Sequence, residues 1–128
     1  MVNKKTPAVK DLVKAWQSHE ADLERYSQKE KRPILFTEFG YLSVDGCAYN
    51  TWELETKVKQ LPINEQAQAN AIDALFTVFF EKDYWAGGFI WKWFPDGKGH
   101  EGYLDRDYTP QGKKAAAILK KWHLGSRK

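Results

Sequence analysis

The sequence predicts an α/β fold in which two buried parallel strands alternate with three helices. Three segments repeat apolar residues at the helical period. Two short segments between them contain consecutive apolar residues, as strands of a parallel sheet do when both of their faces are covered. Because the two kinds of segment alternate along the chain, right-handed β–α–β units and a parallel sheet are favoured.

The first helix is expected over residues 7–28. Thr6 has the character of a capping residue and Pro7 that of a first helical residue. Apolar side chains then recur on one helical face: Val9, Leu12, Val13, Trp16, Leu23 and Tyr26. The first strand is expected over residues 33–39, and Gly40 ends it.

A long connection follows over residues 41–61, and loops of this length are more often functional than idle. Asn64 is a suitable cap for a second helix over residues 64–82. The second strand is expected over residues 87–94. Another loop, over residues 95–108, separates this strand from the last helix.

Thr109 and Pro110 repeat the helix-start pattern, and the last helix is expected to end near Gly125. Two strands alone make a poor sheet because both outer edges lack a partner. A TIM (β/α)₈ barrel uses about 30 residues for each of its units. The 128 residues therefore predict one C-terminal segment, residues 1–128, that supplies the last two parallel strands and three helices of such a barrel.

Composition argues against several functional classes. The net charge is only +3 and the lysines are dispersed, so no nucleic-acid surface is expected. No apolar run has the length of a membrane span, and no spacing of His or Cys suggests a metal or cofactor. Cys47 is the single cysteine, which excludes an intrachain disulfide. The localisation stays open because the parent protein could be longer than this chain.

Glu38 is the most informative residue because of its position. It lies at the carboxyl end of the first strand, before a glycine and a long loop that contains aromatic residues. In a (β/α)₈ barrel this end is the catalytic face. Simple alternation places Glu38 on the same face as Ile34 and Phe36. Position alone supports a catalytic carboxylate and a merely solvent-exposed one about equally.

Three motifs carry a resemblance to a known family. The segment at residues 33–41, PILFTEFGY, resembles the seventh-strand signature of the large superfamily of retaining glycoside hydrolases. The segment at residues 88–93, GFIWKW, is similar to the eighth strand of that superfamily. The segment at residues 107–113, DYTPQGK, and the helix up to Trp122 resemble the C-terminus of its β-mannanase-like branch, glycoside hydrolase family 113. The resemblance covers roughly residues 7–123.

The resemblance implies that Glu38 is the catalytic nucleophile. Retaining glycosidases pair such a nucleophile with a second carboxylate, the acid/base, about 5 Å away. In the family this partner is a Glu that follows an Asn at the end of the fourth strand. The chain has one Asn-Glu pair, Asn64-Glu65, which opens a helix instead, so the isolated chain is expected to be inactive. Weaker candidates for the acid/base are the loop carboxylates Asp45, Asp96, Glu101 and Asp105.

Aromatic residues near the strand ends are candidate sugar contacts. The resemblance implies that Trp91 forms the floor beneath the sugar, and Trp93 is a second choice, because a flat indole can cover the C–H face of a pyranose. The alternative for both is core filling. Tyr41 could hydrogen-bond the nucleophile or pack beneath the loop, and Trp52 and Asn50 are weaker candidates. Core positions are expected for three further residues: Trp16, Trp85 and Trp122.

The leading hypothesis is thus part of a retaining glycoside hydrolase that acts on a β-linked polysaccharide or oligosaccharide, perhaps mannan. The main alternative is a non-catalytic carbohydrate-binding or truncated-gene fragment. A flavodoxin-like domain is disfavoured because no Gly-rich phosphate loop follows the first strand. The unpaired strand edges also predict self-association.

Overall fold

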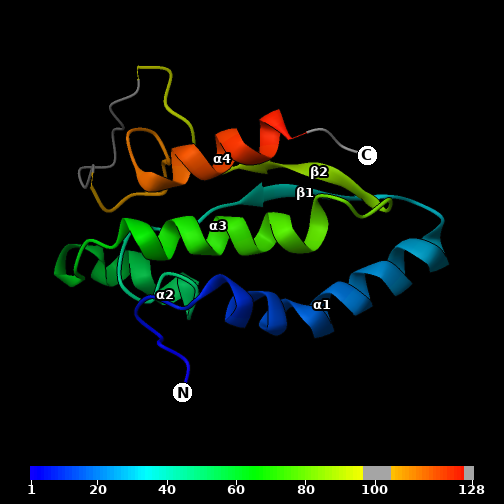
Figure 1. Cartoon of the computed structure of the whole chain (residues 1–128), viewed down its shortest axis with the longest axis horizontal. Helices are drawn as coiled ribbons and strands as arrows, with labels where there is room; N and C mark the ends of the chain where they lie inside the picture. The colour runs from blue at the N-terminus through cyan, green and yellow to red at the C-terminus, as the bar shows by residue number, and fades with distance from the viewer. Residues whose placement is uncertain (97–104, 126–128) are drawn as a thin grey trace.

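A computed structural model of the chain describes residues 1–96 and 105–125. The elements follow in this order: α1 (Val9–Glu30), β1 (Ile34–Phe39), α2 (Thr51–Leu54), the 3₁₀-helix η1 (Glu55–Gln60), α3 (Glu65–Phe79), β2 (Trp85–Ile90) and α4 (Lys114–Leu124). The two strands form a parallel sheet, and the three long helices α1, α3 and α4 lie along it (Figure 1). The predicted alternation of strands and helices is confirmed.

The helix starts differ from the prediction at both Thr-Pro sequences. α1 begins at Val9 with Ala8 as its cap, and no side chain caps it. Thr6 instead accepts a hydrogen bond from the side-chain amide of Asn64, at 2.6 Å. α4 begins only at Lys114. A hydroxyl before a proline therefore predicted a helix start wrongly in both places, because each Thr has a tertiary or turn partner instead.

The cap of α3 was predicted correctly. The side chain of Asn64 accepts a hydrogen bond from the backbone N–H of Ala67 at 2.9 Å, which satisfies one of the free donors of the first turn. The connection over residues 41–61 is less irregular than expected, since it contains α2 and η1. α3 ends at Phe79 rather than at residue 82.

β2 lies earlier in the chain than predicted. It begins at Trp85 and ends at Ile90, so that Trp91 and Trp93 lie beyond the strand. Pairing with β1 runs from Ile34 opposite Trp85 to Phe39 opposite Ile90. The strand ends where its partner ends, because β1 gives way to a loop after Phe39.

An aromatic cluster joins the helices to the inner face of the sheet. Phe79 of α3 is fully buried and meets Trp16, Phe36 and Trp85, with ring centroids 5.2, 5.0 and 6.2 Å away. The indole of Trp122 in α4 packs on the same cluster and donates a hydrogen bond to Asp73. The core roles predicted for the three tryptophans are confirmed.

The opposite face of the sheet has no cover among the described residues. Leu35 of β1 is 51% exposed and Phe89 of β2 is 65% exposed. The sheet contains only these two strands within residues 1–96 and 105–125, so the outer edge of each has no strand beside it. Both faces of the sheet are therefore apolar, but only one is packed.

Candidate active site

Glu38 lies on β1, one residue before its end, and its side chain is exposed. The predicted alternation with Ile34 and Phe36 is wrong. Phe36 and Phe39 of β1 are three positions apart, whereas their partners Gly88 and Ile90 are two positions apart. This bulge adds one residue to β1 and changes the phase of its side chains. Phe39 therefore packs on the core, and Glu38 remains open to solvent.

The ends of the two strands are in backbone contact. The N–H of Trp91 donates a hydrogen bond to the carbonyl of Phe39 at 2.6 Å. A Cβ on Gly40 would lie only 2.0 Å from the carbonyl oxygen of Trp91. Glycine is therefore the only residue that fits directly after the strand that carries Glu38. This contact brings Glu38 and Trp91 to adjacent strand ends.

Tyr41 lies beside Glu38 but does not bond to it. Both residues line a hollow of about 450 Å³, and no hydrogen bond joins the phenol to the carboxylate of Glu38. Tyr41 packs against both hydrophobic clusters. Burial, followed by the nearby thiol of Cys47, raises the pKa of the Tyr41 phenol above its usual range. The packing alternative describes Tyr41 better than the hydrogen-bonding one.

The candidate sugar contacts occupy three places. Trp91 is 42% exposed, and the ammonium of Lys92 lies 4.7 Å from the centroid of its ring. Trp52 is 76% exposed in α2 and lines a hollow of about 500 Å³ together with Tyr41. Asn50, the residue before α2, is exposed and has a left-handed backbone conformation, with φ of 47°. Trp52 and Tyr41 therefore lie around one hollow, whereas Trp91 follows the end of β2.

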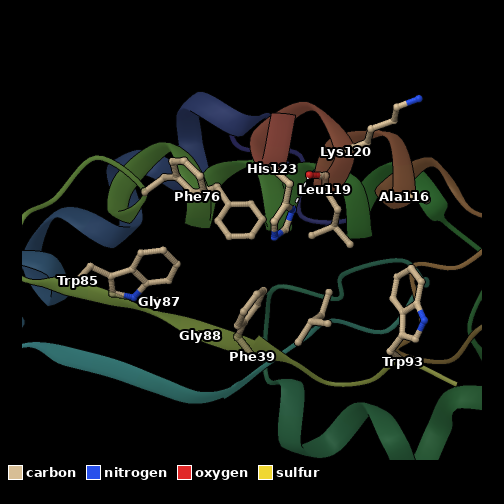
Figure 2. Close-up of a pocket in the computed structure, with 12 residues that line it drawn as sticks. Phe39, Phe76, Trp85, Gly87, Gly88, Trp93, Ala116, Leu119, Lys120 and His123 are labelled. Carbon is tan, nitrogen blue, oxygen red and sulfur yellow. Dashed lines mark hydrogen bonds between the residues drawn. The ribbon is translucent and has the colours of Figure 1, made fainter. Parts of the chain in front are cut away.

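Trp93 faces a different hollow, of about 580 Å³, on the helix side of β2 (Figure 2). Phe39 and Trp85 lie on its sheet side, and His123 of α4 points toward them across the gap. Glu38 does not line this hollow. The hollow that Trp93 faces is therefore separate from the one that Glu38 lines.

The loop carboxylates have different surroundings. Asp45 accepts a hydrogen bond from Asn64 at 2.7 Å, which gives it a structural partner. Asp96 and Asp105 are exposed, and Glu101 lies outside the described residues. Sequence reasoning named Asp107 only as the first residue of the DYTPQGK motif. It missed that Asp107 is fully buried and forms an ion pair with Lys113 at 2.8 Å.

No group of His, Cys, Asp and Glu suited to a metal ion occurs within residues 1–96 and 105–125. In the same part of the chain, none of the helices has the length and apolar character needed to cross a membrane.

Residues 5–113 match the family model of Glycoside Hydrolase Family 113. The chain belongs to this family. Because the match includes both strands and the segment before α4, the resemblance of the three sequence motifs is confirmed. A search of curated proteins found no match.

Solved structures of family 113 enzymes share the fold. One, a β-1,4-mannanase complex, is 24% identical with a TM-score of 0.71, and the match covers 89% of this chain and 36% of that enzyme. The β-mannanase of Alicyclobacillus acidocaldarius in complex with ManMIm is 19% identical with a TM-score of 0.68, and the match covers 87% and 35%. A further β-1,4-mannanase is 24% identical with a TM-score of 0.62, and the match covers 93% and 37%. The chain thus spans about a third of these TIM-barrel enzymes and forms a partial (β/α)₈ barrel.

Proposed function

We propose that the chain supplies the nucleophile and part of the sugar-binding surface of a retaining glycoside hydrolase that acts on β-linked polysaccharide or oligosaccharide. Mannan is the favoured substrate because the similar solved structures are β-mannanases. The observation that carries the proposal is the exposed carboxylate of Glu38 at the end of β1, beside the strand end that leads to Trp91.

The proposed chemistry uses two displacements. The carboxylate of Glu38 attacks the anomeric carbon, and the glycosidic bond breaks as an acid protonates the leaving oxygen. This step leaves the sugar bonded through its anomeric carbon to the carboxylate of Glu38. Water then attacks the anomeric carbon, the deprotonated acid/base takes up the proton of that water, and the carboxylate of Glu38 leaves. Trp91 supports the apolar face of the sugar.

We propose that the acid/base comes from barrel units outside this chain. Asp45 is engaged with Asn64, and neither described exposed alternative, Asp96 or Asp105, lies on a strand. We therefore propose that the isolated chain does not turn over substrate. Its activity requires the units that complete the cleft.

A complete barrel tests the role of Glu38. The chain replaces the matching third of the A. acidocaldarius β-mannanase, and mannan hydrolysis by the graft is compared with that of Glu38→Ala. Turnover is expected to fall by several orders of magnitude, because the covalent step is lost. Added azide should then attack in place of the carboxylate and give a glycosyl azide of inverted configuration.

The control for this test is Asp105→Asn, which removes an exposed carboxylate close to the same end of the sheet and should leave turnover unchanged. Turnover that survives in Glu38→Ala would show that another group is the nucleophile.

The alternative function is sugar binding without catalysis, which the exposed aromatics Trp91 and Trp52 favour. Calorimetric titration of the isolated chain with manno-oligosaccharides distinguishes the two. Binding that depends on Trp91, combined with a graft that is indifferent to Glu38, would support the alternative. Tyr26→Ala, at an exposed aromatic residue on α1, is the matched control for aromatic removal.

A further inference from the structure

The segment over residues 105–113 contacts the loops that follow both strands. On the β1 side, the hydroxyl of Ser43 donates to the carbonyl of Asp105 at 2.7 Å, and the N–H of Ser43 donates to the carbonyl of Asp107 at 3.3 Å. On the β2 side, the segment reaches Phe94. One stretch of chain therefore contacts the loops after both β1 and β2, and the side chains of Gln68 and Gln111 contribute to these contacts.

Gln111 binds Phe94 through both polar atoms of its side chain. Its Oε1 accepts the N–H of Phe94 at 2.7 Å, and its Nε2 donates to the carbonyl of Phe94 at 2.9 Å. The hydroxyl of Thr109 also donates to Oε1, at 2.9 Å, and thereby orients the amide. This two-point contact imitates the pairing of a strand, and it holds the backbone just after Trp93.

Gln68 makes the corresponding connection toward β1. It projects from α3, and its side chain is fully buried. Its Nε2 donates to the carbonyls of Tyr41, Tyr108 and Thr109, at 3.0, 3.1 and 3.3 Å. A single amide therefore ties the loop after Glu38 to the segment that carries Gln111.

We propose that Gln111 is a positioning residue whose amide, anchored through Thr109 and Gln68, sets the backbone after β2 and hence the orientation of Trp91 and Trp93 relative to Glu38. The direct contact between Gly40 and Trp91 fixes how close the strand ends lie. Strand pairing does not continue beyond Trp91, because β2 ends at Ile90. The two hydrogen bonds from Gln111 hold the backbone of Phe94 instead. The significance for sugar recognition rests on the proposed function.

The test uses the whole chain labelled with 5-fluorotryptophan. Its six tryptophans should give separate ¹⁹F resonances. In Gln111→Met the resonances of Trp91 and Trp93 should shift or broaden, whereas those of Trp16 and Trp122 should not. Amide hydrogen exchange at Phe94 should accelerate about tenfold, since two hydrogen bonds of modest net strength are lost. Neither measurement needs a sugar, so the result is independent of the proposed function.

Gln111→Glu provides a rescue that only the hydrogen-bond pair predicts. A protonated carboxyl can both accept from the N–H and donate to the carbonyl of Phe94, whereas a carboxylate can only accept. Wild-type resonances are therefore expected below about pH 4 and the Gln111→Met pattern at pH 7. The matched control is Gln66→Met, at an exposed glutamine on α3 that should leave Trp91 and Trp93 unchanged at both values.

Three outcomes would overturn the inference. In the first, Gln111→Met exposes the amide of Phe94 to exchange but leaves the resonances of Trp91 and Trp93 in place, so that the contact is structural only. In the second, all six resonances move together, so that the effect is general destabilisation. In the third, Gln111→Glu shows no pH dependence, so that the pair of hydrogen bonds does not set the two tryptophans. A manno-oligosaccharide titration of the same variants then asks separately whether positioning alters binding.

Discussion

The ammonium of Lys113 lies 2.8 Å from the carboxylate of Asp107, and the two side chains are only 7% and 0% exposed. The same carboxylate oxygen of Asp107 accepts the backbone N–H of Thr109. This buried pair stabilises the fold of the segment before α4. A buried charge that loses its partner costs far more than an exposed one.

Lys113→Met should therefore lower the free energy of unfolding by about 3–5 kcal/mol, because it leaves Asp107 charged and buried. Urea unfolding followed by tryptophan fluorescence measures this. Lys121→Met is the control, since the pair between Lys121 and Asp73 is largely exposed on the lysine side and its loss should cost less than about 1 kcal/mol. Equal losses in the two variants would contradict the importance of burial.

Gly40→Ala should destabilise the junction between the two strands. The added methyl would have to displace the backbone carbonyl of Trp91, and such overpacking costs about 1–3 kcal/mol or more. Gly125→Ala is the matched control, because its Cβ would meet its neighbours at 3.4 Å or more. Comparable denaturation midpoints for the two variants would show that the strand ends can separate freely.

The thiol of Cys47 should make the protein less stable in alkali. Burial raises its pKa from 9.0 to about 12, so the unfolded chain releases the proton near pH 9 and the folded chain only near pH 12. The free energy of unfolding should fall through this window by up to 1.4 kcal/mol per pH unit. Cys47→Ala should give a shallower decline. An identical slope in the variant would mean that the thiol titrates normally in the fold.

The isolated 128-residue chain should show no hydrolysis of mannan or aryl β-glycosides above background. A missing general acid alone removes a contribution of about 10²–10⁴-fold, and the cleft is also incomplete. Release of reducing sugar by the purified chain measures this. Robust turnover that disappears in Glu38→Gln would show that the chain contains its own acid/base.

The chain should self-associate at micromolar concentration. Leu35 and Phe89 expose apolar surface on the open face of the sheet, and each strand has an unpaired edge among the described residues. Sedimentation velocity should detect dimers or larger species, and Phe89→Lys should reduce them. A monodisperse monomer with slow amide exchange on both strands would argue against association.

Local signals predicted the elements better than their ends. Asn64 was recognised as a cap because its partner lies three residues away in the sequence. Thr6 was misjudged because its partner, Asn64, is distant in the sequence and close only in the fold. The hydroxyl of Thr109 likewise donates a hydrogen bond to Gln111 within a turn. Gln68 of α3 and Phe94 hold that turn in place. Contacts of this kind decide where a helix begins and leave no periodic signal.

The candidate site shows the same division. The position of Glu38 at a strand end followed from the apolar run before it, whereas the bulge that directs its side chain outward depends on pairing with β2. The burial of Gln68 and Asp107 was missed because the sequence does not distinguish a buried polar residue from a solvated one. Only the fold shows that both side chains are shielded from water.

The bare face of the sheet has a calorimetric consequence. In the monomer, apolar groups there are hydrated before as well as after unfolding, so they add little to the difference in heat capacity between the folded and unfolded states. The heat-capacity change of unfolding should therefore fall below the usual value of about 12–15 cal/mol/K per residue. The free energy of unfolding should then curve less with temperature than that of a domain of the same length with a fully covered sheet.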